Sequence, residues 1–307
     1  QGETVGAQLT GDDRVRGVMF TGSTEVATLL QRNIASRLDA QGRPIPLIAE
    51  TGGMNAMIVD SSALTEQVVV DVLASAFDSA GQRCSALRVL CLQDEIADHT
   101  LKMLRGAMAE CRMGNPGRLT TDIGPVIDSE AKANIERHIQ TMRSKGRPVF
   151  QAVRENSEDA REWQSGTFVA PTLIELDDFA ELQKEVFGPV LHVVRYNRNQ
   201  LPELIEQINA SGYGLTLGVH TRIDETIAQV TGSAHVGNLY VNRNMVGAVV
   251  GVQPFGGEGL SGTGPKAGGP LYLYRLLANR PESALAVTLA RQDAEYPVDA
   301  QLKAALT

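Results

Sequence analysis

Hydrophobic and polar positions near the start of the chain follow a strand period and then a helix period. The apolar run at residues 18–20 predicts a strand, and Gly22 and Ser23 predict a tight turn with Ser23 as the N-cap of a helix to about Leu38. A second apolar run ends at Glu50. Strand, helix and strand in this order form the middle of an α/β unit, with no earlier strand for residues 18–20 to pair with. We therefore expect a piece cut from a longer protein.

The same alternation continues through the rest of the chain. Helical spacing of apolar residues, or a helix-like composition, occurs at residues 64–80, 95–113, 129–145, 201–209 and 223–230. Short apolar strands are expected at residues 88–92, 190–194, 215–219 and 239–241. Alternating strands and helices predict an α/β fold with a mostly parallel sheet.

Three parts follow from this pattern. Residues 1–53 are expected to be the remnant of a Rossmann-type nucleotide-binding domain, residues 54–262 a catalytic α/β domain, and residues 263–307 a C-terminal segment. Glycines crowd residues 247–269, but an aromatic residue in Pro254-Phe255-Gly256-Gly257 argues against a flexible linker. The apolar run at residues 284–289 predicts a strand that pairs in another subunit, so we expect a homo-oligomer.

Composition excludes several classes of function. The chain has 307 residues, 43% of them hydrophobic, and a net charge of −8, which disfavours nucleic acid and anionic membranes as partners. No apolar run approaches the roughly 18 residues of a membrane span, and no secretory signal opens the chain. Three cysteines without a tight pair indicate a reducing, cytoplasmic compartment, with Cys91 and Cys111 as small core residues. The five histidines lack metal-ligand spacing, so no metal is expected.

Cys84 is the first candidate for chemistry. It follows a predicted helix and a Gly81-Gln82 turn, where backbone N–H groups can point at a developing oxyanion. A positive potential from Arg83 would favour the thiolate, while burial would oppose it. A nucleophile and a buried core cysteine both fit this residue on its own.

Glu50 is the second candidate. It ends an apolar strand and precedes Thr51-Gly52-Gly53, glycines that let a ligand approach the backbone. Such a carboxylate can serve as the general base that activates water for thioester hydrolysis, or it can simply face solvent.

Two further motifs suit a dinucleotide. Gly22 and Ser23 at a helix N-terminus offer N–H groups and a helix dipole to a pyrophosphate, although an ordinary N-cap explains them as well. Glu185 could accept hydrogen bonds from two ribose hydroxyls, and Phe187 could pack on a nicotinamide or ribose face. A turn before a strand explains this second motif equally well.

The motifs around these residues, taken in order, resemble the aldehyde dehydrogenase superfamily. The matching segments are Phe20 to Ser23, Glu50 to Gly53, Phe77 to Cys84, Glu185 to Pro189 and Pro254 to Gly257. The resemblance implies NAD as cofactor, Cys84 as nucleophile and Glu50 as general base. It places Gly22 and Ser23 at the pyrophosphate, Thr51 and Gly52 beside the nicotinamide, and Glu185 and Phe187 at the nicotinamide ribose.

A narrower likeness concerns the substrate. Ser85 after the cysteine, the pair Gly247-Ala248 and Phe255 are similar to the L-glutamate-γ-semialdehyde (Δ1-pyrroline-5-carboxylate) dehydrogenase branch. This implies that Ser85, Gly247 and Ala248 bind the substrate's α-carboxylate and that Phe255 packs on its aliphatic part. The implied reaction is the NAD-dependent oxidation of L-glutamate γ-semialdehyde to glutamate, the second step of proline catabolism.

The likeness extends to bifunctional proline-catabolising flavoproteins, including the tail at residues 280–285. It implies a parent chain with a proline dehydrogenase part, to which any FAD would belong. The family's oxyanion-hole asparagine, its ribose-binding lysine and the first half of its nucleotide-binding sheet would precede Gln1, so we expect the chain alone to be inactive. A sister aldehyde dehydrogenase for another semialdehyde, or a catalytically incomplete structural fragment, remain as alternatives.

Overall fold

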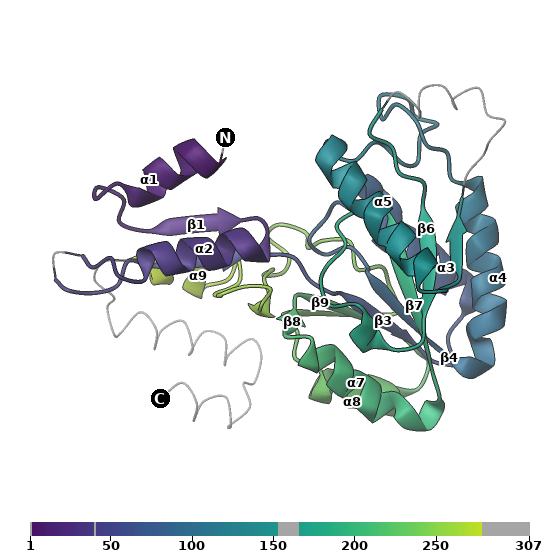
Figure 1. Cartoon of the computed structure of the whole chain (residues 1–307). Coiled ribbons are helices and arrows are strands. Elements are labelled where there is room, and N and C mark those ends of the chain that lie inside the picture. Colours follow the sequence, from purple (N-terminus) through teal and green to yellow (C-terminus); the bar gives the residue numbers. More distant parts are fainter. Residues whose placement is uncertain (1, 40, 153–165, 278–307) are drawn as a thin grey trace.

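The computed structural model describes residues 2–39, 41–152 and 166–277, which form a small and a large sheet (Figure 1). In the small sheet, β1 (Val18–Thr21) pairs in parallel with β2 (Leu47–Glu50). The two strands are joined through α2 (Thr24–Ile34), and β1 is preceded by the π-helical turn η1 (Gly2–Gly6) and by α1 (Ala7–Gly11). The predicted strand, helix and strand are therefore present, and β1 takes the later strand β2 as its partner.

The large sheet has seven strands in the order β10-β9-β3-β4-β7-β6-β5. Every neighbouring pair is parallel except β5 with β6, which confirms the predicted α/β fold with a mostly parallel sheet. The strands are β3 (Ala56–Val59), β4 (Val89–Gln93), β5 (Val149–Gln151), β6 (Thr172–Leu176), β7 (Val190–Tyr196), β9 (Thr216–His220) and β10 (Asn238–Val241). A short antiparallel pair joins β8 (Tyr213–Gly214) to β11 (Glu258–Gly259).

Helices cover both faces of the large sheet (Figure 1). The longer helices are α3 (Thr65–Phe77), α4 (Asp94–Glu110), α5 (Ser129–Ser144), α7 (Leu201–Ala210) and α8 (Asp224–Ser233). The chain moves one way across the sheet from β3 to β4 and the other way from β7 to β9 and β10. Because parallel crossovers are right-handed, α3 and α4 lie on one face and α7 and α8 on the other.

Short helical segments complete the described chain. They are the 3₁₀ turns η2 (Asp78–Gly81), η3 (Phe179–Glu181) and η4 (Arg198–Gln200), and α9 (Leu271–Leu276). None of the described helices is long and apolar enough to cross a membrane. The predicted strand at residues 284–289 lies outside the described residues.

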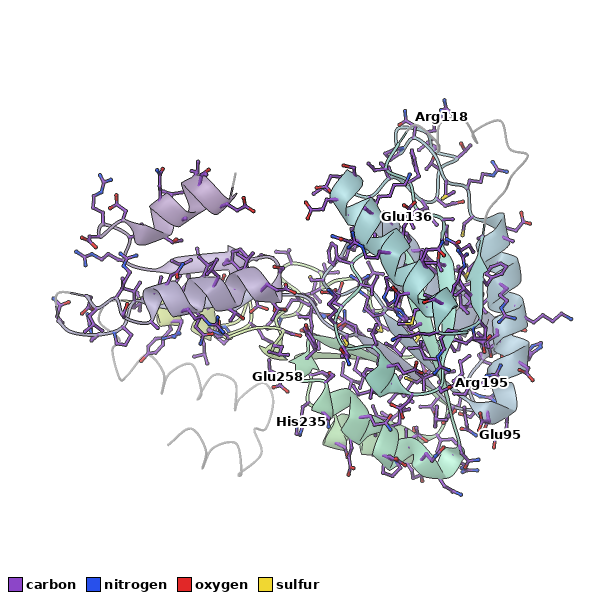
Figure 2. The ribbon with its side chains drawn as sticks, viewed as in Figure 1. Glu95, Arg118, Glu136, Arg195, His235 and Glu258 are labelled. Carbon is purple, nitrogen blue, oxygen red and sulfur yellow. The ribbon has the colours of Figure 1, made fainter. Side chains whose placement is uncertain are left out.

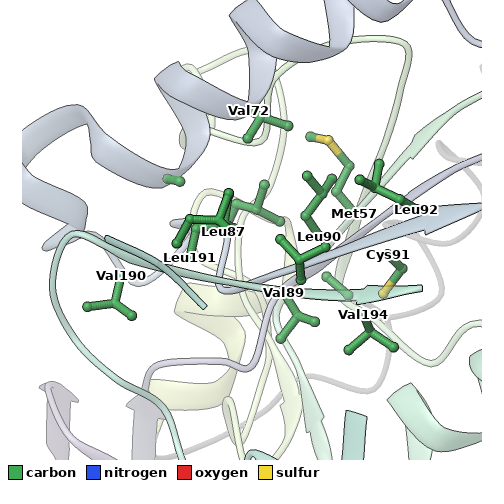
Figure 3. Packing of buried hydrophobic residues seen from close by; sticks show 14 of the residues in the cluster. Met57, Val72, Leu87, Val89, Leu90, Cys91, Leu92, Val190, Leu191 and Val194 are labelled. Atoms are coloured by element: carbon green, nitrogen blue, oxygen red, sulfur yellow. The ribbon is translucent and has the colours of Figure 1, made fainter. Parts of the chain in front are cut away.

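The core surrounds the central strands. Every residue of β3 and β4 is buried, and Figure 3 shows Met57, Leu90 and Cys91 packed with side chains of α3 and β7. Strands buried on both faces read as continuous apolar runs, and such a run predicted β4, whereas β3 was not predicted. Charged side chains such as Glu95 and Arg195 lie outside this core (Figure 2).

Three helices end earlier than the apolar pattern predicts: α2 at Ile34, α3 at Phe77 and α4 at Glu110. After α3, Ser79 and Ala80 have φ values of 55° and 54°, a left-handed backbone that cannot continue an α-helix. After α4, Cys111 is extended and half-buried, and its thiol donates to the carbonyl of Ala107 at 3.7 Å. Cys91 is fully buried as predicted, while Cys111 only borders the core.

Candidate active site

A pocket of about 1010 Å³ lies between the two sheets. Gly22 and Thr51 reach it from the carboxyl ends of β1 and β2. Cys84 and Glu185 reach it from the segments that precede β4 and β7. The site is therefore formed where the carboxyl edge of the small sheet faces the amino edge of the large one.

The pocket brings together nearly all of the residues singled out in the sequence. It is lined by Gly22, Ser23, Thr51, Gly52, Cys84, Ser85, Glu185, Phe187, Gly247, Ala248 and Phe255. Glu50 is the exception, because it does not line the pocket. The glycine-rich segment supplies part of the wall, which agrees with the prediction that it is not a linker.

The loop that carries Cys84 is fixed by its backbone. The Asn55 side-chain amide donates to the carbonyls of Cys84 at 2.7 Å and Ala86 at 2.9 Å. Gly81 has a φ of 67°, and a Cβ there would clash with the carbonyl of Gly188. Glycine is therefore required where the loop passes the segment before β7.

Gln82 anchors the same loop on its other side. Its amide group donates to the carbonyl of Pro125 at 3.2 Å, and its amide oxygen accepts from the N–H of Ile127 at 2.7 Å. The segment before α5 thus supports the loop before Cys84.

Arg88 is a site residue that the sequence pattern did not reveal. Its fully buried guanidinium donates to the carbonyls of Gly81 at 2.6 Å and Arg83 at 3.0 Å. It also pairs with the carboxylate of Glu185 at 2.9 Å and lies 5.1 Å from the ring centroid of Phe187. The available signal was an arginine inside the otherwise apolar run of residues 86–92, where a buried charge needs a partner.

The thiol of Cys84 is half-buried, and burial raises its pKa. Backbone N–H groups of Ser85 and of Cys84 itself, together with the charge of Arg88, lower the pKa, while Glu185 raises it. The arginine that favours the thiolate is thus Arg88. The sequence had suggested Arg83, whose guanidinium instead donates to the hydroxyl of Ser79 at 3.0 Å.

Glu50 ends β2 as predicted, but its carboxylate turns toward the glycine-rich segment. Oε2 accepts from the N–H of Gly257 at 3.1 Å, and Oε1 is buried without a hydrogen-bond partner. Burial raises the pKa of Glu50, whereas the Gly257 N–H and the charge of Lys266 lower it. A buried carboxylate with a raised pKa suits a general base, and in this structure it does not line the pocket that holds Cys84.

The wall formed by Gly22, Ser23, Thr51 and Gly52 is held in place locally. Ser23 is the N-cap of α2, with its hydroxyl accepting from the N–H of Val26 at 3.3 Å, as predicted. The hydroxyl of Thr51 donates to the carbonyl of Leu260 at 2.6 Å. A Cβ at Gly52 would clash with the carboxylate of Glu185, so only glycine lets these two walls meet.

Ser85, Gly247 and Phe255 meet on another wall. The buried hydroxyl of Ser85 accepts from the N–H of Gly247 at 3.0 Å. Phe255 is held by two backbone hydrogen bonds to Ala267, at 2.9 and 2.8 Å. Of the residues implied for substrate recognition, Ser85 and Gly247 are linked by a hydrogen bond, and Ala248 and Phe255 line the same pocket.

Comparison with known proteins decides the family. The family model described as "Aldehyde dehydrogenase family" matches residues 1–278, most of the chain. The chain belongs to the aldehyde dehydrogenase family. The family match is consistent with the α/β fold and with a pocket lined by Cys84.

Its relatives within the aldehyde dehydrogenase family include proteins of proline catabolism. The chain is 99% identical over its whole length to "Bifunctional protein PutA" of Escherichia coli, of which it covers 23%. It is 35% identical over 89% of its length to "1-pyrroline-5-carboxylate dehydrogenase" of Geobacillus kaustophilus, of which it covers 52%. The chain thus spans about a quarter to a half of the length of these relatives.

A solved structure of a 1-pyrroline-5-carboxylate dehydrogenase has a fold similar to that of this chain. The 1-pyrroline-5-carboxylate dehydrogenase from Thermus with bound NAD has a TM-score of 0.81 and 35% identity, over 92% of this chain and 54% of that one.

Proposed function

We propose that this chain carries the nucleophile, the general base and part of the cofactor site of an NAD-dependent L-glutamate-γ-semialdehyde dehydrogenase. The observation that carries the proposal is the single pocket shared by Cys84, the wall around Ser85 and Gly247, and the wall around Gly52 and Glu185. The names of the relatives support the same reaction. The division into parts at residues 53 and 262 stays a prediction.

The residues present suit NAD. Ser23 and Gly22 stand at the N-terminus of an eleven-residue helix, where N–H groups and the helix dipole favour a pyrophosphate. Thr51, Gly52, Glu185 and Phe187 line the same part of the pocket, where a flat nicotinamide ring and its ribose can lie. When bound, NAD accepts a hydride from the substrate carbon.

Cys84 forms the covalent bond to the substrate. Burial raises the pKa of Cys84, so the protonated thiol has to lose its proton to water before it can react. The thiolate then attacks the aldehyde carbon. The oxygen of the resulting thiohemiacetal carries a negative charge, which the backbone N–H of Cys84 is placed to stabilise. Loss of a hydride from that carbon leaves a thioester on Cys84.

Glu50 acts in the second half of the reaction. Its carboxylate turns from Gly257 toward the pocket and takes a proton from water, and the hydroxide adds to the thioester carbon. The C–S bond then breaks, glutamate leaves, and the proton returns to the sulfur of Cys84. Since Glu50 ends β2 directly before the pocket residue Thr51, rotation of its side chain is the movement required.

Ser85, Gly247 and Ala248 select the substrate. In the proposed complex, the α-carboxylate of the semialdehyde accepts from the Ser85 hydroxyl and from the N–H groups of Gly247 and Ala248, and it replaces the hydrogen bond between Gly247 and Ser85. Phe255 gives an apolar surface for the methylene groups between that carboxylate and the aldehyde.

We also propose that this chain belongs to a longer parent protein with a proline dehydrogenase part, and that only this part holds FAD. We further propose that the protein forms homo-oligomers in solution.

Two substitutions test the proposal in the full-length protein, meaning a polypeptide with this sequence and the further segments that its long relatives carry. Cys84→Ala is expected to reduce NADH formation from the semialdehyde to background. Glu50→Gln is expected to keep a single-turnover burst of NADH but to slow steady-state turnover by about 100-fold or more, the usual contribution of a general base. Turnover above background in Cys84→Ala, or normal thioester decay in Glu50→Gln, would contradict these roles.

A comparison of substrates separates the proposal from a sister aldehyde dehydrogenase. The wild-type protein should turn over glutamate semialdehyde far better than propionaldehyde, and Ser85→Ala should reduce this preference. Equal use of both aldehydes would favour the sister enzyme.

A further inference from the structure

The retracted position of Glu50 is formed by a cluster of chain segments around Gly256. The position that a Cβ would take at Gly256 lies 2.9 Å from Oε1 of Glu50 and 3.0 Å from the Cα of Lys266. Gly237 packs on the same residue, because a Cβ there would clash with the carbonyl of Gly256. The carboxylate, Lys266 and the start of β10 thus meet at one glycine.

Lys266 is held in this cluster by backbone and side-chain contacts. Its neighbour Ala267 exchanges two backbone hydrogen bonds with Phe255, which fixes the course of the main chain. Its ammonium donates to the carbonyl of Gly237, and the residue is half-buried. The ammonium is therefore held just before β10, next to the glycine that both Glu50 and the main chain of Lys266 approach.

Glu50 needs such a neighbour, because its own hydrogen bonds are incomplete. One carboxylate oxygen accepts from the N–H of Gly257 at 3.1 Å, and the other is buried without a partner. Burial alone favours the neutral acid. Among the described residues, Lys266 is the one side chain whose charge acts on the pKa of Glu50. The carboxylate of Glu185, which packs on Gly52, is paired with Arg88.

We infer that Lys266 is a positioning residue for Glu50: its ammonium keeps the retracted carboxylate ionised and clear of the pocket, and so sets the pH at which hydrolysis of the thioester begins. The inference rests on the proposed function of Glu50. It assigns Lys266 no contact with substrate or cofactor, because Lys266 does not line the pocket. Glu50 then remains a base while the pocket is free to hold a nicotinamide.

The test is the pH dependence of hydrolysis in the full-length protein. Lys266→Met removes the charge and keeps an unbranched side chain. Because the ionised form of Glu50 is the active base, loss of Lys266 should move the rising limb of thioester hydrolysis by about half a pH unit or more toward higher pH. The NADH burst should keep its amplitude, and Lys266→Arg should restore most of the wild-type profile.

Lys132→Met is the matched control. The ammonium of Lys132 also donates to a glycine carbonyl, that of Gly166 at 3.2 Å, but it lies at α5 and does not act on the pKa of Glu50. It should leave the pH profile unchanged. If Lys266→Met does not fold, Lys266→Gln gives the same readout with a polar side chain.

The outcomes separate this inference from the proposed function. An unchanged profile in the Lys266 variants, with Glu50→Gln still stalling hydrolysis, overturns the role of Lys266 alone. Normal hydrolysis in Glu50→Gln overturns the role of Glu50 itself. A shift in Lys266→Met that Lys266→Arg reverses supports the inference.

Discussion

Arg88 connects the loop of Cys84 to the segment of Glu185 and Phe187. Its guanidinium is fully buried and donates to two carbonyls of the loop and to the carboxylate of Glu185. Burial raises the pKa of Glu185, and the pairing with Arg88 opposes that rise. A buried ion pair of this kind is costly to break, because the remaining charge loses its partner.

Replacing Arg88 should therefore strongly destabilise the folded protein. Arg88→Met is expected to lower the free energy of unfolding by about 3–5 kcal/mol, measured by urea denaturation of the full-length protein. Arg88→Met with Glu185→Gln should recover part of this loss, since the unpaired carboxylate is then absent. Equal losses in the single and double variants would show that the ion pair is not the cause.

The position of Arg88 within an apolar run hinted at a buried charge but did not indicate this role. In a strand pattern, Arg88 reads as the polar beginning of an apolar run, and its partner Glu185 lies 97 positions away. The direction of the Glu50 carboxylate was equally hidden, because it depends on the N–H of Gly257, which is distant in the sequence. Residue types and their motifs were predictable, whereas the atoms that each side chain contacts were not.

The N-terminus of α2 is both a capped helix end and part of the pocket wall. Ser23 caps the helix through the N–H of Val26, and Asp128 caps α5 through the N–H of Ala131 at 2.8 Å. Only the first of these two helix ends lines the pocket.

This difference makes the two caps a matched pair. Ser23→Ala and Asp128→Ala should each cost about 1 kcal/mol of stability. Only Ser23→Ala should also weaken NAD binding to the full-length protein, measured as the dissociation constant by calorimetry. Unchanged affinity in Ser23→Ala would contradict the placement of the pyrophosphate at α2.

Many of the elements were predictable because the core is layered, but β3, β5 and β6 were not predicted. Strands buried on both faces, such as β4, appear as apolar runs, and α5 shows its apolar positions at helical spacing. Helix ends were less predictable. The end of α3 depends on the left-handed backbone of Ser79 and Ala80, and neither serine nor alanine is a residue type from which such a backbone is predicted.

A pair of histidines, of which His192 is buried and His138 half-buried, links α5 to the large sheet. The Nε2 atoms of His138 and His192 lie 2.8 Å apart, and Nδ1 of His192 is 3.1 Å from the carbonyl of Arg88. Burial lowers the pKa of His192 to about 3, helped by the charges of His138 and Arg88. Burial also lowers the pKa of His138, as do Lys145 and Lys184.

Stability should therefore depend on pH below neutrality. The unfolded chain binds a proton at His192 near pH 6.5, whereas the folded chain does so only near pH 3. The contribution of His192 is complete above about pH 6.5 and is lost as pH falls toward 3, by up to about 1.4 kcal/mol per pH unit. Urea unfolding at pH 7, 6 and 5 measures this slope. His192→Gln should flatten it, while replacement of the exposed His99 by Gln should not.

The position of the pocket is also a property of the whole molecule. It uses the carboxyl ends of β1 and β2 but the amino ends of β4 and β7, so it exists only where two sheets face each other. A pattern of strands and helices does not reveal how two sheets are oriented, and this arrangement could not be read from the chain.

The left-handed run of Ser79, Ala80 and Gly81 limits how the nucleophile could be transplanted into a designed scaffold. Three successive residues with φ between 54° and 67° are unfavourable for two L-residues, and the run persists because Arg88 and Gly188 hold Gly81 in place. If only the eight residues that end in Cys84 were grafted, the segment would relax to an ordinary turn and no longer hold the cysteine side chain in its present orientation. The smallest portable module is discontinuous: the loop, strand β4 with its arginine, and the segment of residues 185–188.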